Sequence, residues 1–194
     1  LDLEAMKSWL GPYIDRIDRI RFYNYGETFL HPGSIDFCTF LRKKRPDIEI
    51  DIATNLIPLD SDEKIRALIE AEPNILKVSL HGASHEKAKQ YMGDKSDFNR
   101  VLDTMKRIVE LRNKQGKKYP LVMWKYLLFS WNDTDEEIEK AKTLCGKSNI
   151  DIFALELASG PNASKRFAKG TPELKALHES EWYEKKIIKE LLKH

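Results

Sequence analysis

A glycine and a glutamate directly follow the first strand-like run of the sequence, and residues of these two types could form a ligand site there. Residues 20–25 are mostly β-branched and aromatic, as in a buried strand, and Gly26 and Glu27 follow them. A glycine at the end of a strand lets a ligand approach the backbone closely, and Glu27 would lie on the rim where α/β proteins bind substrates. The alternative is a turn glycine with a solvated glutamate.

Polar residues end or follow the four later strand-like runs in the same way. They are Asn55, Ser79, His81, Lys125 and Glu156. Because the carboxyl ends of parallel strands meet at one edge, we expect these residues to converge with Glu27 on one rim. Gly82 directly follows His81, so we expect this histidine to be a solvated loop residue rather than a metal ligand. Such convergence indicates a binding or active site, but it does not identify a reaction.

Two features inside the strand-like runs need partners. Lys125 interrupts an apolar and aromatic run, and it would extend to solvent, pair with a carboxylate inside a barrel, or bind an anionic ligand, in that order of preference. In residues 47–55, isoleucines alternate with polar residues. If the isoleucines face covering helices, Glu49 and Asp51 point to the opposite side and require polar neighbours there.

Strand-like and helix-like runs alternate along the whole chain. Strands are expected at residues 20–25, 47–55, 75–81, 121–129 and 150–157, and helices at 1–12, 34–45, 60–73, 96–114, 132–146 and 173–193. This order predicts an α/β fold with five parallel strands, either a partial barrel or a doubly wound sheet. The length of 194 residues suits a single domain over residues 1–194.

Composition argues against several classes of protein. A net charge of +2 gives no reason to expect nucleic acid or a membrane as a partner, and no apolar run approaches the roughly 18 residues of a membrane span. Cys38 and Cys145 lie far apart in helix-like segments, so we expect buried thiols, no disulfide and a reducing cytoplasm. The sequence has no phosphate-binding loop, no nucleophile elbow and no zinc-ligand spacing.

The order of four motifs resembles the radical S-adenosylmethionine (SAM) superfamily. The motifs are Asn24–Pro32, Ala53–Asn55, Val78–Ser84 and Asp97–Leu102. Two later stretches, Phe129–Asp133 and Ala163–Phe167, resemble the SPASM/twitch-like branch, whose members carry cluster-binding extensions beyond the core. The resemblance covers most of the chain, and it implies a six-stranded partial (β/α)6 TIM-like barrel that generates a 5′-deoxyadenosyl radical from SAM at a 4Fe-4S cluster.

The resemblance also assigns roles to individual residues. Gly26 and Glu27 match the motif that receives the methionine ammonium of SAM, for which a carboxylate is a suitable acceptor. Asn55 and Ser79 match strand-end positions near the methionine or ribose part, and Lys125 would face the cofactor carboxylate. The implied partners are a small-molecule or peptide substrate and an electron donor such as flavodoxin or ferredoxin. No catalytic residue is identified.

Two departures from the family pattern affect these expectations. Thr28 stands where proline is usual, which should loosen the turn. The Cys-x-x-x-Cys-x-x-Cys motif is absent, and two distant cysteines cannot hold three irons of a 4Fe-4S cluster. We therefore expect no metal to be held by these cysteines. The expected molecule is a truncated core that lacks the first strand and the cluster loop and is inactive alone.

Two other functions stay open. A cluster-free α/β barrel could serve as a binding or scaffold module whose rim residues only satisfy each other. A metal-independent lyase or isomerase could form a Schiff base at Lys125, with Glu156 or Glu27 as the base.

Overall fold

The computed structural model describes residues 2–22, 26–93 and 97–191, which divide into two compact units. The first unit comprises Leu1–Val78 with Thr104–Val122, and the second comprises Ser79–Asp103 with Met123–His194. Each unit is described by itself. The prediction of one domain over the whole chain stays a prediction.

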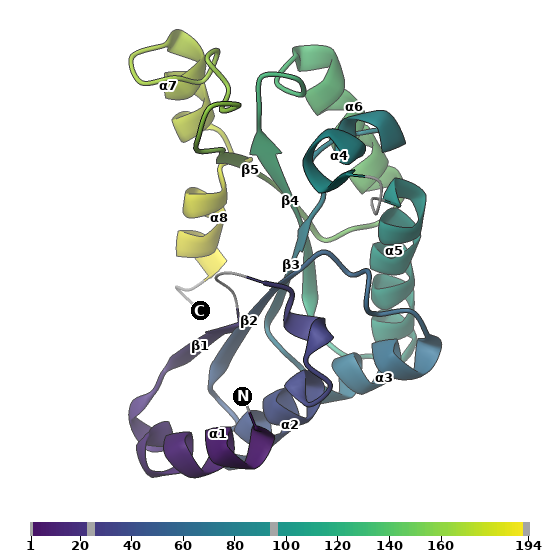
Figure 1. Cartoon of the computed structure of the whole chain (residues 1–194), viewed down its shortest axis with the longest axis vertical. Coiled ribbons are helices and arrows are strands. Elements are labelled where there is room, and N and C mark those ends of the chain that lie inside the picture. Colours follow the sequence, from purple (N-terminus) through teal and green to yellow (C-terminus); the bar gives the residue numbers. More distant parts are fainter. Residues whose placement is uncertain (1, 23–25, 94–96, 192–194) are drawn as a thin grey trace. The chain divides into compact units, whose positions relative to one another are not determined.

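The first unit contains three parallel strands and the helices that connect them (Figure 1). Its elements are α1 (Leu3–Leu10), η1 (Gly11–Arg16), β1 (Arg19–Phe22), η2 (Thr28–Leu30), α2 (Ser34–Lys44), β2 (Glu49–Thr54), α3 (Asp62–Ala71) and most of β3 (Ile75–Ser79) and α5 (Phe98–Lys114). β2 pairs in parallel with β1 on one side and with β3 on the other. Helices α2 and α3 pack against each other.

The second unit repeats this alternation. It contains α4 (His85–Met92), most of β4 (Leu121–Leu128), α6 (Asp135–Lys147), β5 (Ile152–Leu157), α7 (Pro172–Glu179) and α8 (Glu184–Leu191). β4 and β5 pair in parallel over six residues, from Met123 opposite Ile152 to Leu128 opposite Leu157. The prediction of an α/β fold with five parallel strands that alternate with helices is confirmed.

The alternating pattern of β2 places its two kinds of side chain on opposite faces. Ile50 and Ile52 are fully buried, and each such side chain contributes roughly 1.5–3 kcal/mol through burial. On the other face Arg19 pairs with Glu49, and the Nε of Arg21 lies 3.9 Å from the Oδ2 of the buried Asp51. The expectation that Glu49 and Asp51 have polar neighbours is confirmed, although the Oδ2 of Asp51 has no hydrogen-bond partner among the described residues.

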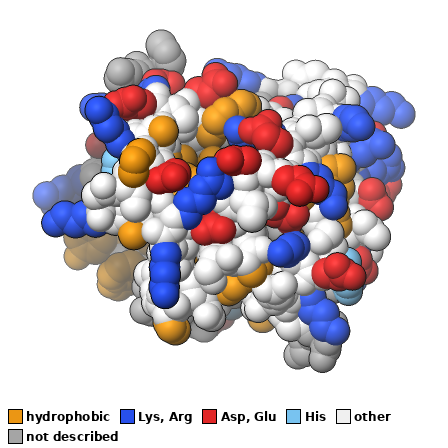
Figure 2. Space-filling model, turned by 90° about the horizontal axis from the view of Figure 1, so that it is seen from above, with side chains coloured by type: hydrophobic (Ala, Val, Ile, Leu, Met, Phe, Trp, Pro, Cys, Tyr) orange, Lys and Arg blue, Asp and Glu red, His pale blue; other side chains and the backbone are white. Residues whose placement is uncertain are grey.

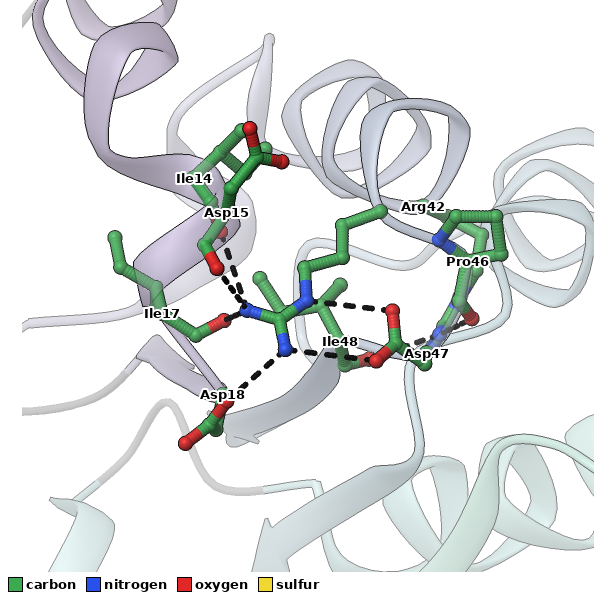
Figure 3. Close-up of polar contacts among 9 residues, drawn as sticks. Ile14, Asp15, Ile17, Asp18, Arg42, Pro46, Asp47 and Ile48 are labelled. Carbon is green, nitrogen blue, oxygen red and sulfur yellow. Dashed lines mark hydrogen bonds and ion pairs between the residues drawn. The ribbon is translucent and has the colours of Figure 1, made fainter.

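The end of α2 is fixed by a single arginine, Arg45. Its guanidinium donates hydrogen bonds to the backbone carbonyls of Ile14, Asp15 and Ile17, at 3.3, 3.2 and 2.6 Å (Figure 3). It also pairs with the carboxylates of Asp18 and Asp47, and these hydrogen bonds lower the pKa of Asp47. The last carbonyls of a helix have few donors within it, and here Arg45 supplies donors in addition to the N–H of Ile17, which bonds to the carbonyl of Ile14. Arg45 therefore joins η1 to the segment before β2.

The predicted last helix is wrong in one respect, because it is two helices. α7 ends at Glu179 and α8 begins at Glu184. Between them the carbonyl of Trp182 accepts a 2.7 Å hydrogen bond from the backbone N–H of Leu155, and Tyr183 forms an isolated parallel bridge with the same leucine. A backbone that pairs with β5 cannot continue as a helix, so this pairing divides the predicted helix.

The helix α4 was not among the predicted helices, and α6 begins at Asp135 rather than at residue 132. The N-cap of α6 is Thr134, whose hydroxyl accepts a hydrogen bond from the N–H of Glu137. Asn132 and Asp133, the first two residues of the predicted helix, instead accept hydrogen bonds from the N–H of Phe129 and the hydroxyl of Ser164. The periodicity of α4 is weak because Ala88 is its only buried residue, so the pattern carried little helical signal.

Charged side chains of both signs are mixed on the face of the molecule shown in Figure 2. That face has no large area of one sign of the kind that attracts a nucleic-acid backbone. No helix in the described part of the chain is both long and apolar enough to cross a bilayer.

We predict that Gly82→Ala destabilises the protein by about 2 kcal/mol or more. A Cβ at this position would lie 2.6 Å from the Cβ of Lys87 and 2.7 Å from the backbone nitrogen of Ala88, and the helix backbone cannot swing aside. Urea unfolding measures the loss. Gly146→Ala in α6 is the control, since nothing lies within 4 Å of its Cβ and the exchange should stabilise by up to about 1 kcal/mol. Equal effects of the two exchanges would contradict the prediction.

Candidate functional site

In the first unit, the carboxylate of Glu27 joins the ends of β1 and β2. Its Oε1 accepts hydrogen bonds from the hydroxyl of Thr54 at 2.6 Å and from the N–H of Phe29 at 3.1 Å. Its Oε2 accepts one from the N–H of Asn55 at 2.6 Å. Each carboxylate oxygen has two lone pairs, so these three bonds leave one acceptor position, on Oε2.

The residues on either side of Glu27 hold it in this position. Gly26 is exposed and has a φ of +116°, a backbone conformation that residues other than glycine rarely adopt. The hydroxyl of Thr28 lies 2.9 Å from the carbonyls of both Phe22 and Ala53, so it links the two strands. Thr28 therefore stabilises the turn, whereas we expected a threonine at this position to loosen it.

The structure brings three of the five predicted cofactor residues together in this unit: Gly26, Glu27 and Asn55. The side chain of Asn55 is used locally, because its Oδ1 accepts a hydrogen bond from the N–H of Ile57 at 2.9 Å. Only its backbone N–H reaches Glu27. The roles of these residues toward a cofactor stay predictions.

The other two predicted cofactor residues, Ser79 and Lys125, belong to the second unit, where Lys125 has a carboxylate partner. Ser79 is the half-buried last residue of β3. The ammonium of Lys125 pairs with Glu156 and lies 4.0 Å from Glu184, the first residue of α8. Burial raises the pKa of Glu156, and a hydrogen bond with Glu184 raises it further, whereas Lys125 lowers it. Of the three interpretations of Lys125, pairing with an interior carboxylate is the one that the structure shows.

His81, expected in solvent, is buried with 1% of its surface exposed. Its Nδ1 accepts a 3.1 Å hydrogen bond from the N–H of Leu127, which leaves the proton on Nε2. Burial, and secondarily the charge of Lys125, lowers its pKa to about 3. The expectation was wrong because Tyr91, which covers this ring, lies on the helix α4 that the sequence pattern did not reveal.

Four rings form an aromatic group at the ends of β3 and β4 in the second unit. His81 lies edge-to-face with Tyr91 at 4.6 Å, and Phe129 lies 5.3 Å from Tyr91 and stacks on Trp131 at 4.4 Å. Tyr91 is 51% exposed, so the group is accessible from one side. The indole N–H of Trp131 is buried and has no hydrogen-bond partner among the described residues. Sequence reasoning missed this group, although His81 lies in the motif Val78–Ser84 and both Phe129 and Trp131 lie in the stretch Phe129–Asp133.

A fully buried amide, that of Asn132, holds the aromatic group and the strand ends in place. Its Nδ2 donates to the carbonyls of His81 and Leu127, at 3.3 and 3.0 Å, and its Oδ1 accepts from the N–H of Phe129 at 2.7 Å. Its own carbonyl accepts from the hydroxyl of Tyr126 at 2.9 Å. Both N–H groups of the amide and its oxygen therefore have hydrogen-bond partners at the ends of these strands, as a buried amide requires.

The described residues do not fit an iron–sulfur cluster. They contain no group of three or more His, Cys, Asp or Glu side chains placed to hold a metal ion. Cys38 and Cys145 are both free and buried, and burial raises the pKa of each thiol to about 12, far from the thiolate form that binds iron.

In a comparison with known families, the model of the radical SAM superfamily matches residues 2–145. The match covers about three quarters of the chain and ends before β5, α7 and α8. It contains no evidence for the SPASM/twitch-like branch. No curated protein matched the sequence.

Among solved structures, the chain is similar to the HMG-CoA lyase of Bacillus subtilis. The TM-score is 0.48 at 13% sequence identity, over 80% of this chain and 51% of that chain. The chain thus spans about half of the length of the lyase.

We predict that Asn132→Asp costs about 3 kcal/mol or more of unfolding free energy. The exchange replaces a donor that serves two buried carbonyls by an acceptor, and it buries a charge. Urea unfolding near neutral pH provides the measurement. Asn162→Asp, at an exposed position, should change stability by no more than about 0.5 kcal/mol. A loss below 1 kcal/mol at Asn132 would show that its amide is dispensable.

We further predict that His81 makes the fold sensitive to acid. The unfolded chain binds a proton at this residue below a pH of about 6.5, but the folded chain does so only near 3. The contribution of neutral His81 to the free energy of unfolding is therefore fully present above a pH of about 6.5. It is lost as the pH falls toward 3, by up to about 1.4 kcal/mol per pH unit. In His81→Asn, whose Oδ1 can replace Nδ1 as acceptor, this loss should be absent.

Unfolding by urea at several pH values between about 7 and 4 compares the variant with the wild type. His85→Asn, at the exposed first residue of α4, is the control and should follow the wild type. If His81→Asn has the same pH slope as the wild type, His81 does not carry the acid sensitivity.

Proposed function

The chain belongs to the radical SAM superfamily, and from that premise we propose that it supplies the SAM-binding strand ends of an enzyme that cleaves SAM reductively. The complete enzyme would generate a 5′-deoxyadenosyl radical, which abstracts hydrogen from a substrate. The cofactors in this proposal are SAM and a 4Fe-4S cluster. The two buried cysteines do not fit that cluster, so its thiolates would come from outside these 194 residues.

The observation that carries the proposal is the remaining acceptor position on Glu27. Three donors fix the carboxylate at the carboxyl ends of β1 and β2, and the lone pair left on Oε2 can accept one N–H from an ammonium. Gly26 has no side chain, and among the described residues other than its chain neighbours nothing lies within 4 Å of where a Cβ would be. A fixed carboxylate beside an open backbone suits the amino group of the methionine part of SAM.

The remaining parts of the proposal follow from the superfamily rather than from contacts in this chain. An electron donor of the flavodoxin or ferredoxin type would reduce the cluster. Two free buried cysteines are consistent with a reducing cytoplasm. The substrate would be a small molecule or a peptide.

We predict that Glu27→Gln weakens SAM binding roughly 10- to 100-fold, because a hydrogen bond to a charged partner contributes about 1.5–3 kcal/mol. Calorimetric titration of the purified chain with SAM measures the effect. A wild-type chain that binds no SAM at millimolar ligand would contradict the proposal.

Thr54→Val is the matched control. It removes one of the bonds that support the Glu27 carboxylate but leaves the acceptor position on Oε2. We expect its affinity to fall less than that of Glu27→Gln. If both variants lose the same affinity, the carboxylate acts only as a brace between strands.

A further inference from the structure

A groove of about 570 Å³ runs along one face of α7 in the second unit. All the residues that line it lie between positions 170 and 179, and most of them are exposed, so it is an open groove on one helix rather than an enclosed chamber. It lies beyond residues 2–145, which match the family model, and it shares no residue with the site around Glu27.

The sequence of α7 places the lining residues on one side of the helix. Leu174 and Lys175 lie four and three residues before His178, so the three side chains share a face. Leu177, on another face, is buried, so that side of α7 packs against the rest of the unit. At the start of the groove Gly170 has a φ of +93°, and among the described residues other than its chain neighbours nothing lies within 4 Å of where a Cβ would be. The groove is therefore open at its N-terminal end.

The groove combines an apolar part with two side chains that donate hydrogen bonds. The apolar part comes from the exposed ring of Pro172 and the half-buried side chain of Leu174. The hydroxyl of Thr171 serves the chain itself, since it donates to a backbone carbonyl at 2.9 Å and accepts from the N–H of Leu174 at 3.2 Å. The side-chain donors left for a partner are therefore the ammonium of Lys175 and the imidazole of His178, which are both exposed.

The charge beside the groove is mainly positive. Lys175 forms no ion pair with the residues that the structure describes, and neither does Lys169, which directly precedes the groove. The lining contains one carboxylate, that of Glu179, and the backbone carbonyl of the same residue accepts a 3.0 Å hydrogen bond from the ammonium of Lys186 on α8. Glu173 is two residues before Lys175 and does not share its face. Three ammonium groups therefore border the groove, against one carboxylate.

An acidic peptide in an extended conformation fits this groove in length and charge. The eight residues of α7 span about 12 Å, which matches about three to four residues of an extended chain. Side chains two residues apart share one side of such a chain, so an apolar side chain can cover Leu174 while carboxylates before and after it meet the ammonium groups. We propose that the α7 groove docks an extended acidic segment of a partner protein, in which an apolar side chain lies between carboxylates.

Fluorescence anisotropy of the purified chain with a dye-labelled synthetic peptide tests the proposal. The probe contains one leucine with two aspartates on each side, and two comparison peptides replace either the leucine by serine or the aspartates by lysine. The leucine probe should bind about tenfold more tightly than the serine peptide, because the groove covers the leucine. The lysine peptide should not bind, since its charges repel those beside the groove.

Two variants assign the binding to the groove. Lys175→Glu should weaken binding of the leucine probe about tenfold or more, whereas Lys140→Glu, at an exposed position of α6 outside the lining, should retain the affinity although the net charge changes equally. Leu174→Ser should reduce the preference for the leucine probe over the serine peptide. Circular dichroism confirms that each variant is folded.

Several outcomes would overturn the proposal. They are no binding of the leucine probe at about 1 mM, equal binding of the leucine and serine peptides, and equal affinity of Lys175→Glu and the wild type. Sedimentation of the chain alone provides a further test, because a dimer that Lys175→Glu dissociates would show that a second copy occupies the groove instead. Since SAM takes no part, these outcomes are independent of the calorimetric test of Glu27.

Discussion

The structure depends on how it satisfies backbone groups where its parallel strands end. A strand in a sheet has partners for its N–H and C=O groups, but these partners stop at the strand's carboxyl end, and a buried polar group without a partner costs about 1–3 kcal/mol. In each unit a side chain supplies hydrogen-bond partners for these backbone groups. In the first, Glu27 accepts from the backbone beyond β2, and in the second the amide of Asn132 joins the segments after β3 and β4.

The same side chains give the strand ends their chemical character. A carboxylate fixed by three donors cannot rotate away, so the acceptor position that it keeps points in one direction. Fixing the group before a ligand arrives reduces the entropy that binding would otherwise cost. The carboxylate of Glu27 therefore both stabilises the first unit and forms the proposed contact with SAM. A substitution of Glu27 should weaken folding and binding together.

The sequence was informative where structure follows from local pattern and less so where it follows from distant partners. The isoleucine alternation of β2 showed which side chains share a face, because period two is a property of any strand, but it did not show that Asp51 on the opposite face is buried as well. The burial of His81 depends on Tyr91, and the break before α8 depends on Leu155 of β5, so neither is encoded in its own segment. Motifs mark Gly26, Glu27 and Asn55, and the structure brings these three residues together, whereas their roles toward a cofactor stay predictions.

The pairing of Trp182 with β5 also bears on how the protein behaves at high concentration. β5 has β4 on one side, and a strand with a free second side offers a row of unpaired N–H and C=O groups to any extended chain. Here the carbonyl of Trp182 and the bridge at Tyr183 occupy part of that second side. The half-buried indole ring adds bulk there, so the short segment before α8 also shields the sheet against edge-to-edge aggregation.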